Sequence, residues 1–228
     1  TEFLANVSYE LRSPLTSITG FSDILMQEFF GQLTDKQREY VQGIHQSSQQ
    51  LGSLINNILD LASIEAGYLQ LHIDEVNVYT MLTSVIALVT ERTKALNITL
   101  KTDFPVDIGT IKADETRLRQ VVFNLLSNAV KYSDRGGTIT LSARRDNDIF
   151  ECCVIDEGVG IEPEHQERIF ERFYRSGASR GQQSGSGLGL SIVKSFIELH
   201  GGSVSVDSTP SKGTCFTCRL PADCKPNG

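Results

Sequence analysis

The sequence predicts an α+β protein in which an antiparallel helical hairpin precedes a two-layer α/β sandwich. Two observations predict it. In the first third of the chain, apolar residues recur at alternating spacings of three and four, the period of an amphipathic helix, in two stretches separated by a short break. From about residue 68, short alternating segments are interleaved with helical ones. We therefore expect domains at residues 1–67 and 68–221, and a tail at 222–228.

Length and composition fit this organisation. The 228 residues, 39% hydrophobic and 21% charged, are typical of one or two globular domains with an ample core. A net charge of −7 argues against a nucleic-acid partner. No apolar run approaches the roughly 18 residues that span a bilayer, so we expect a cytoplasmic location, with tethering only through segments upstream. The chain opens without Met inside a predicted helix, which indicates a fragment.

The hairpin begins with a helix over residues 1 to about 29, followed by a break at 31–34. Thr34 is a candidate N-cap, and Gln37, three residues later, completes a capping box. The second helix runs to about residue 66 and ends at Gly67. The two apolar seams are Leu4, Val7, Leu11, Pro14, Ile18, Phe21 and Leu25, and Tyr40, Ile44, Ser47, Leu51, Leu54, Ile58 and Leu61.

One hairpin cannot cover both faces of such seams, so we predict a homodimer in which two hairpins form a four-helix bundle. A hairpin packed on its own second domain is the alternative.

The second domain reads as mixed helix and strand. We expect strands at residues 69–76, 98–104, 110–113, 138–144, 149–155, 203–207 and 214–220, and helices at 78–96, 116–132 and 188–200. Gly201-Gly202 closes the last helix, and a frayed tail is expected from Pro221. The odd, unclustered set of five cysteines fits a reducing compartment. Cys215 and Cys218 have metal-like spacing, but an offset of three points them to opposite faces of a strand.

Two short motifs bring carbonyl and carboxylate oxygens into the second domain. Asn124 and Asn128 lie one helical turn apart on one face, and an amide carbonyl is a hard ligand suited to Mg²⁺. Asp156 ends a predicted strand, and Gly158 and Gly160 let the backbone approach a bound molecule. Alone, the asparagines would fit a helix surface and Asp-x-Gly-x-Gly a turn.

Two further motifs follow. Residues 169–175, Ile-Phe-Glu-Arg-Phe-Tyr-Arg, lead into a Ser-, Gly- and Gln-rich segment at 176–186 whose composition fits a mobile lid; an ordinary helix end is the alternative. Glycines then precede a helix and expose backbone N–H groups to phosphate. The last motif is neither a Rossmann fingerprint nor a P-loop, since Leu190 takes the final glycine position and no Gly-Lys-Ser/Thr follows.

In this order the four motifs resemble the N, G1, F and G2 boxes of the ATP-binding domain of two-component sensor histidine kinases, a fold shared with Hsp90, DNA gyrase B and MutL. Gly-Thr-x-Phe at 213–216 matches the family's closing motif. Glu157 stands where the family usually has Asn, and Asp156 is intact. The resemblance implies ATP and Mg²⁺, with Asn128 as the metal contact. The other implied site residues are Asn124, Lys131, Tyr132, Asp156, Gly158, Gly160, Arg175, Gly185, Gly187, Leu188 and Gly189.

Residues 3–15 resemble the family's phospho-acceptor box, in which a histidine precedes Glu-Leu-Arg-Thr-Pro-Leu. Here Tyr9 stands in the histidine position. A phenol with a pKa of about 10 is ionised in roughly one molecule in a thousand at pH 7. Tyrosine also moves the nucleophile outward, and a misplacement of about 1 Å can cost about a hundredfold in rate. A phosphotyrosine ester would not pass its phosphoryl group to an aspartate, so we expect the usual relay to be lost.

Three functions follow from this resemblance. The first is an atypical signalling core, a pseudokinase that binds ATP and docks a response-regulator receiver domain. The second is an autokinase that phosphorylates Tyr9 with Glu10 taking the proton. The third is a receiver phosphatase in which Glu10 and Ser13 take the places of the family's acid and water-orienting residue. The remaining alternative is that Tyr9 packs at the hairpin surface and takes part in no reaction.

Overall fold

The computed structural model describes residues 2–146, 148–175 and 186–224, with the backbone alone described at residues 2–9. The chain divides into two compact units, Thr1–Leu69 and Gln70–Gly228. Within the described residues, no helix has the length and apolarity required to cross a membrane.

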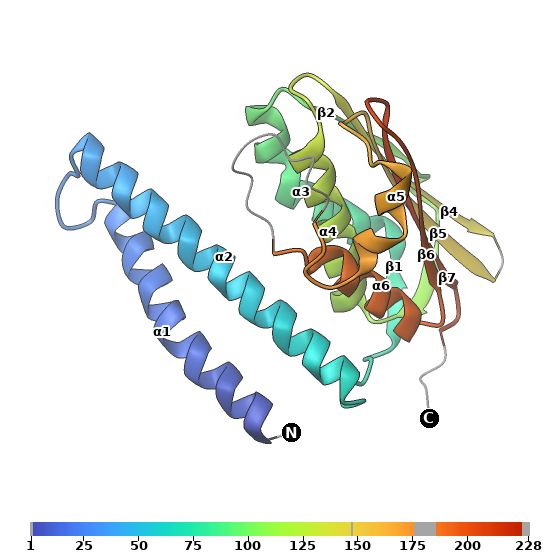
Figure 1. Ribbon diagram of the computed structural model, residues 1–228, viewed down its shortest axis with the longest axis horizontal. Coiled ribbons are helices and arrows are strands. Elements are labelled where there is room, and N and C mark those ends of the chain that lie inside the picture. The colour runs from blue at the N-terminus through green and yellow to red at the C-terminus, as the bar shows by residue number, and fades with distance from the viewer. Residues whose placement is uncertain (1, 147, 176–185, 225–228) are drawn as a thin grey trace. The chain divides into compact units, whose positions relative to one another are not determined.

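The first unit is a helical hairpin of α1 (Glu2–Met26) and α2 (Asp35–Glu65) (Figure 1). The predicted capping box is confirmed, because the Thr34 side chain accepts the Gln37 N–H while the Gln37 side chain accepts the Thr34 N–H. Glu28, at φ 55°, ends α1 slightly earlier than predicted. Its carboxylate accepts the Leu33 N–H at 3.0 Å and pairs with Arg38 at 2.5 Å, which fixes the turn.

The contact between α1 and α2 uses a different set of residues from the predicted seams. Leu15, Val41, Ser48 and Ser22 are buried, and a Cβ at Gly52 would lie 3.0 Å from the Leu15 side chain. Of the large apolar seam residues from Leu11 onward, Leu61 is buried. The others are half-buried or exposed in the single chain: Leu11, Ile18, Phe21, Leu25, Tyr40, Ile44, Leu51, Leu54 and Ile58. The hairpin therefore carries a second apolar stripe that its own packing leaves open.

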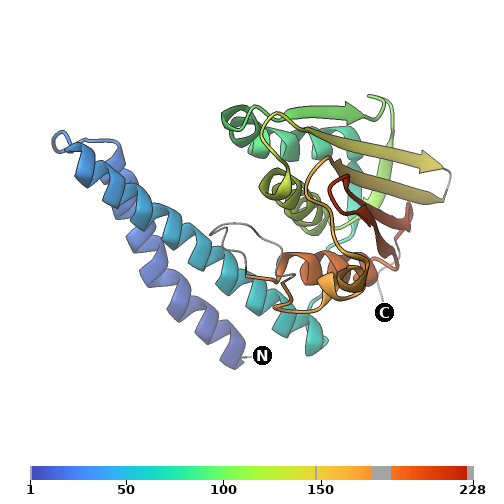
Figure 2. The ribbon, with the colours of Figure 1, turned by 45° about the horizontal axis from the view of Figure 1, so that its top comes forward.

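The second unit is the predicted two-layer sandwich. Its five-stranded sheet has the order β2 (Thr99–Asp103), β4 (Thr138–Asp146), β5 (Ile149–Asp156), β7 (Gly213–Pro221), β6 (Ser203–Thr209). The β2–β4 pair is parallel and the other pairs are antiparallel. α3 (Val78–Ala95), α4 (Glu115–Tyr132) and α6 (Gly189–Leu199) pack on one face of the sheet (Figure 2). β1 (Asp74–Asn77) pairs with β3 (Thr110–Ala113) in a separate antiparallel ribbon.

Alternating burial along the strands places the core between the layers. Every second residue of β5, and of β4 as far as Ala143, is buried against the helices, and the apolar stripes of α4 and α6 face them. Cys218 is buried in this core, while Cys215, three residues earlier on β7, is half-buried on the opposite face, as its spacing predicted.

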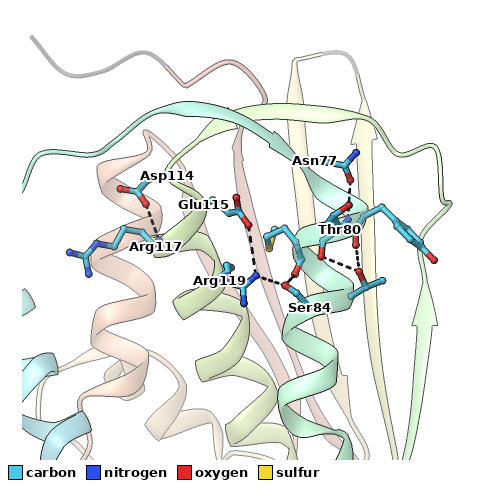
Figure 3. Close-up of polar contacts among 10 residues, drawn as sticks. Asn77, Thr80, Ser84, Asp114, Glu115, Arg117 and Arg119 are labelled. Carbon is cyan, nitrogen blue, oxygen red and sulfur yellow. Dashed lines mark hydrogen bonds and ion pairs between the residues drawn. The ribbon is translucent and has the colours of Figure 1, made fainter. Parts of the chain in front are cut away.

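Polar contacts fix the helices within this layer. Asn77 caps the start of α3 and Asp114 caps the start of α4. Figure 3 shows Arg119 of α4 reaching across to α3, where it donates to the Ser84 hydroxyl, with the Glu115 carboxylate 3.8 Å away. These ties hold α4, which carries the two asparagines of the candidate site, in a fixed position.

Two expectations for this unit were wrong, and two short helices were not predicted. The strand expected at 69–76 begins only at Asp74, because residues 69–73 pair with no other strand. Sequence periodicity did not predict the short helices α5 (Pro163–Gln166) and η1 (Arg168–Phe170), which are too brief to show a period. The chain from Pro221 to Cys224 is not frayed: the Ala222 N–H donates to the Asp148 carbonyl and the Ala222 carbonyl accepts the Lys112 N–H, each at 2.8 Å, and Cys224 is buried.

Candidate functional site: a nucleotide site at the end of the sheet

The first part of the site comes from the exposed turn of α4. Asn124 and Asn128 are both half-buried and share one face of the helix. The Asn124 amide donates to the Gly189 carbonyl at 3.4 Å, which links α4 to the start of α6. Among the described residues, the Asn128 side chain makes no hydrogen bond, so its carbonyl oxygen is free to take a ligand. At the end of α4, the Lys131 ammonium lies 4.9 Å from the centre of the Tyr132 ring.

Asp156 supplies a buried carboxylate at the end of β5. Only 6% of its surface is exposed, and burial raises the pKa of its carboxyl group. The backbone N–H groups of Gly158, at 2.9 Å, and of Thr214 donate to the carboxylate and oppose that rise. The charged form is thus held in place by two donors, with acceptor capacity left for a bound molecule.

The glycines after Asp156 allow a close approach of backbone segments. A Cβ at Gly158 would lie 2.3 Å from the Tyr132 carbonyl oxygen, and one at Gly160, where φ is 70°, would lie 2.2 Å from the Thr209 carbonyl oxygen. Val159 also donates its N–H to the Tyr132 carbonyl at 3.3 Å. The loop therefore joins the end of α4 to the ends of β5 and β6.

The motif at 169–175 contacts the glycine-rich motif that precedes α6. Phe173 donates its N–H to the Gly187 carbonyl at 3.0 Å, and Gly187, at φ 71°, passes so close that a Cβ would lie 2.8 Å from the Phe173 backbone. Arg175 is exposed. Of the predicted lid at 176–186, residues 176–185, Gly185 among them, lie outside the described residues.

Tyr174 is fixed by two neighbours that carry no motif signature. Its hydroxyl lies 2.7 Å from His165 Nδ1 of α5, and the Arg168 guanidinium lies 4.3 Å from the centre of its ring. The residue next to His165, Gln166, donates to the carbonyls of Ile161 and Ser208 at 3.0 and 2.8 Å. Sequence reasoning missed these contacts, because the short turns that bring His165 and Arg168 to Tyr174 have no periodicity and Ser208 is 42 residues from Gln166.

α6 begins with open backbone donors. Its N-cap residue, Leu188, makes no side-chain cap hydrogen bond, and Gly189 is the first helical residue. Ser186 accepts only the Leu188 N–H, at 3.3 Å. The other N–H groups of the first turn have no intrahelical partner, and together with the positive end of the helix dipole they form a ready site for an anion.

The predicted acceptor lies on α1 of the other unit. Tyr9 is helical in its backbone, and its side chain lies outside the described part of the molecule. Glu10 and Ser13 are exposed on the same helix. Between them, the Arg12 guanidinium is turned toward α2 and donates to the side-chain oxygen Oδ1 of Asn56 at 3.2 Å.

Family comparisons match both units. Residues 1–67 match the His Kinase A (phospho-acceptor) domain, and residues 113–223 match the histidine kinase-, DNA gyrase B-, and HSP90-like ATPase family. The chain is 38% identical over 225 residues to the sensor protein DivL of Caulobacter vibrioides, a match that covers 99% of this chain and 28% of DivL.

Two solved structures share the fold. Full-length ShkA in complex with AMPPNP has a TM-score of 0.77 at 32% identity, over 96% of this chain and 45% of ShkA. The histidine kinase ThkA in complex with the response regulator protein TrrA has a TM-score of 0.66 at 25% identity, over 97% of this chain and 61% of that one. The chain spans only 22% to 43% of the length of the curated relatives that it matches. With its phospho-acceptor hairpin and its ATP-binding domain, the chain belongs to the sensor histidine kinase family and forms the core of such a kinase.

Proposed function

We propose that the chain is an atypical signalling core that binds Mg-ATP in its second unit and docks a receiver domain on its hairpin, without a working histidine-to-aspartate relay. The observation that carries this proposal is a contrast. The nucleotide motifs converge around Asp156 and the open start of α6, whereas the acceptor position holds Tyr9. The resemblance to ShkA, which was solved with AMPPNP, supports the nucleotide half.

In this proposal, Asp156 accepts a hydrogen bond from the adenine amino group, and Gly158 and Gly160 let the base approach the backbone. Lys131, Tyr132 and Arg175 face the sugar and phosphates. The N–H groups at Gly185, Gly187 and Gly189 bind phosphate oxygens. The Leu188 N–H joins them when it exchanges the Ser186 hydroxyl for a phosphate oxygen.

The residues around Asn128 fit a magnesium ion that is held jointly with phosphate. The described part of the chain has no group of three or more His, Cys, Asp or Glu side chains able to hold a metal alone. Mg²⁺ commonly takes one or two protein oxygens and completes its shell with water and phosphate. The Asn128 carbonyl oxygen, with Asn124 one turn away, meets that requirement, and bound Mg²⁺ would neutralise charge on the phosphates.

The hairpin supports the other half of the proposal. Its open apolar stripe, which includes Leu51 and Ile58, each at least 42% exposed, suits a homodimeric four-helix bundle. The complex of ThkA with a response regulator protein supports a receiver domain as the docking partner.

A second candidate function is a receiver phosphatase. It is favoured by Glu10 and Ser13, which are exposed on the helix that carries Tyr9 and so can reach a docked phosphoaspartate. Ser13 keeps the hydroxyl needed to orient a water molecule.

Mass spectrometry of Tyr9 after incubation with Mg-ATP tests the proposal. We expect ATP binding with no phosphate on Tyr9, and phosphorylation of the Tyr9→His variant under the same conditions. Rapid phosphorylation of Tyr9 itself would contradict the proposal and establish the autokinase. Asp156→Asn in the Tyr9→His background is the control that ties any phosphorylation to this nucleotide site.

A further inference from the structure

The Ser208 hydroxyl lies beside the base end of the nucleotide site and has three hydrogen-bond partners. The Ile161 N–H is 2.8 Å from Ser208 Oγ, the Gly213 carbonyl oxygen is 2.9 Å away, and the Thr214 hydroxyl oxygen is 2.9 Å away. These contacts connect the loop after β5 with the ends of β6 and β7.

The direction of each hydrogen bond follows from the chemistry of a hydroxyl group, which has one proton and two lone pairs. The Ile161 N–H can only donate and the Gly213 carbonyl can only accept. The single Ser208 proton therefore goes to Gly213. Consequently the Thr214 hydroxyl must donate its own proton to Ser208.

Thr214 is the direct cross-strand neighbour of Asp156. Side chains at such paired positions point to the same face of a sheet, about 4.5–5.5 Å apart at Cβ. Both residues are only 6% exposed, at the end of the sheet where the proposed adenine site lies. Because Ser208 holds the Thr214 proton, Thr214 offers only lone pairs here, and the neighbouring carboxylate likewise accepts.

We infer that Ser208 is a specificity-determining positioning residue, which makes this end of the site an acceptor-only surface that selects a base with an exocyclic amino group over a base with a carbonyl there. The inference rests on the proposed binding of adenine at Asp156. The adenine amino group donates to such a surface, directly or through a water molecule. The guanine O6 atom would instead face lone pairs, and a polar group left without a partner is costly to bind.

The experiment compares the dissociation constants of Mg-ATP and Mg-GTP by calorimetry on the whole chain. In Ser208→Ala the Thr214 proton is released and can turn toward the guanine O6 atom. We expect the ratio of the GTP to the ATP dissociation constant to fall by about tenfold, which corresponds to ~1.4 kcal/mol. Ser208→Thr, which keeps the hydroxyl, should restore the ratio. Ser205→Ala, at an exposed position on the same strand, should leave it unchanged.

A double substitution distinguishes the orientation of the Thr214 hydroxyl by Ser208 from a general role of Ser208 in stabilising the loop after β5. With Thr214→Val as background, Ser208→Ala has no proton to release, so the ratio should no longer change. An equal loss of both nucleotides in Ser208→Ala would overturn the inference, as would an effect that persists without the Thr214 hydroxyl. Wild-type protein that binds neither nucleotide would overturn the proposed function and this inference with it.

Discussion

Gly213 lies so close to Asp156 that a Cβ on Gly213 would sit 1.9 Å from the Asp156 carbonyl oxygen. Gly213 also has a φ of 111°, a backbone conformation that residues other than glycine rarely adopt. The strand that ends at Asp156 and the strand that begins at Gly213 therefore meet with no room for a side chain.

We expect Gly213→Ala to lower the free energy of unfolding by about 3 kcal/mol or more, through backbone strain and the steric clash together. Urea unfolding measures it. Gly136→Ala is the matched control, because Gly136 has a φ of 84° and no atom within 4 Å of an added Cβ. The free energy of unfolding of that control should fall by about 1–2 kcal/mol. An equal fall in both variants would show that the close contact with Asp156 does not contribute to the cost of the Gly213→Ala substitution.

Asp156→Asn should separate nucleotide affinity from stability. Folding raises the pKa of this carboxyl above its unfolded value, so the ionised form costs stability once the pH rises through the folded pKa. The asparagine carbonyl can still accept the Gly158 N–H. We expect calorimetry to show ATP binding weakened by about 10- to 100-fold, with a melting temperature at pH 7 that is equal or higher. Asp207→Asn, at an exposed position on β6, should change neither property.

His200 should make the second unit sensitive to mild acid. The ring is buried, its Nδ1 donates to the Phe196 carbonyl at 2.7 Å, and its Nε2 accepts the Asp114 N–H at 3.1 Å. Burial lowers the pKa of His200, and the Phe196 carbonyl and the Asp114 carboxylate oppose that shift. Protonation would place a second donor against the Asp114 N–H.

The lowered folded pKa fixes the sign of this effect. The contribution of His200 to stability is fully present above about pH 6.5, the unfolded value, and is lost as the pH falls toward the folded pKa. Urea unfolding of the wild type and His200→Gln between pH 8 and pH 5.5 measures it. We expect the wild type to be more stable at pH 8 and its advantage to shrink with acid. If the wild type were more stable than His200→Gln by the same free energy throughout this pH range, the prediction that folding requires a neutral His200 ring would be wrong.

Local signals explain which parts of the fold the sequence could predict. The Thr34–Gln37 capping box depends on residues three apart, and the periodicity of α4 covers five turns, so both were visible in the sequence. The partners of His200 and Ser208 depend on how distant segments come together. Asp114 is 86 residues from His200, and Ile161 is 47 residues from Ser208. No sequence spacing carries that information, which is why motif reading found Asp156 and the motif at 213–216 but missed Ser208.

A charge placed on the open stripe of the hairpin should prevent dimerisation. Leu51 is 50% exposed in the single chain, and Leu51→Glu would bury an unpaired carboxylate in a four-helix bundle. Light scattering should show a dimer for the wild type and a monomer or aggregate for this variant. Gln42→Glu, which adds the same charge at an exposed position on the opposite side of α2, should remain a dimer. An unchanged dimer in Leu51→Glu would rule out this stripe as the interface.

Receiver docking should survive the loss of relay chemistry. Docking depends on shape and apolar surface. Beside the acceptor position, the hairpin offers the exposed Ser13 and Ser17 on α1 and the partly exposed segment 51–55 on α2. None of these contacts requires an imidazole. Titration of candidate receivers against the wild type and Tyr9→His should therefore give dissociation constants that agree within about twofold. Adding Ser17→Arg to either protein should weaken docking by about tenfold or more, because it places a bulky charge in the contact. Gln42→Arg, on the far side of α2, is the control for added charge. If the wild type binds no receiver while Tyr9→His binds one and passes phosphate to it, Tyr9 blocks docking itself, and the chain is not a scaffold.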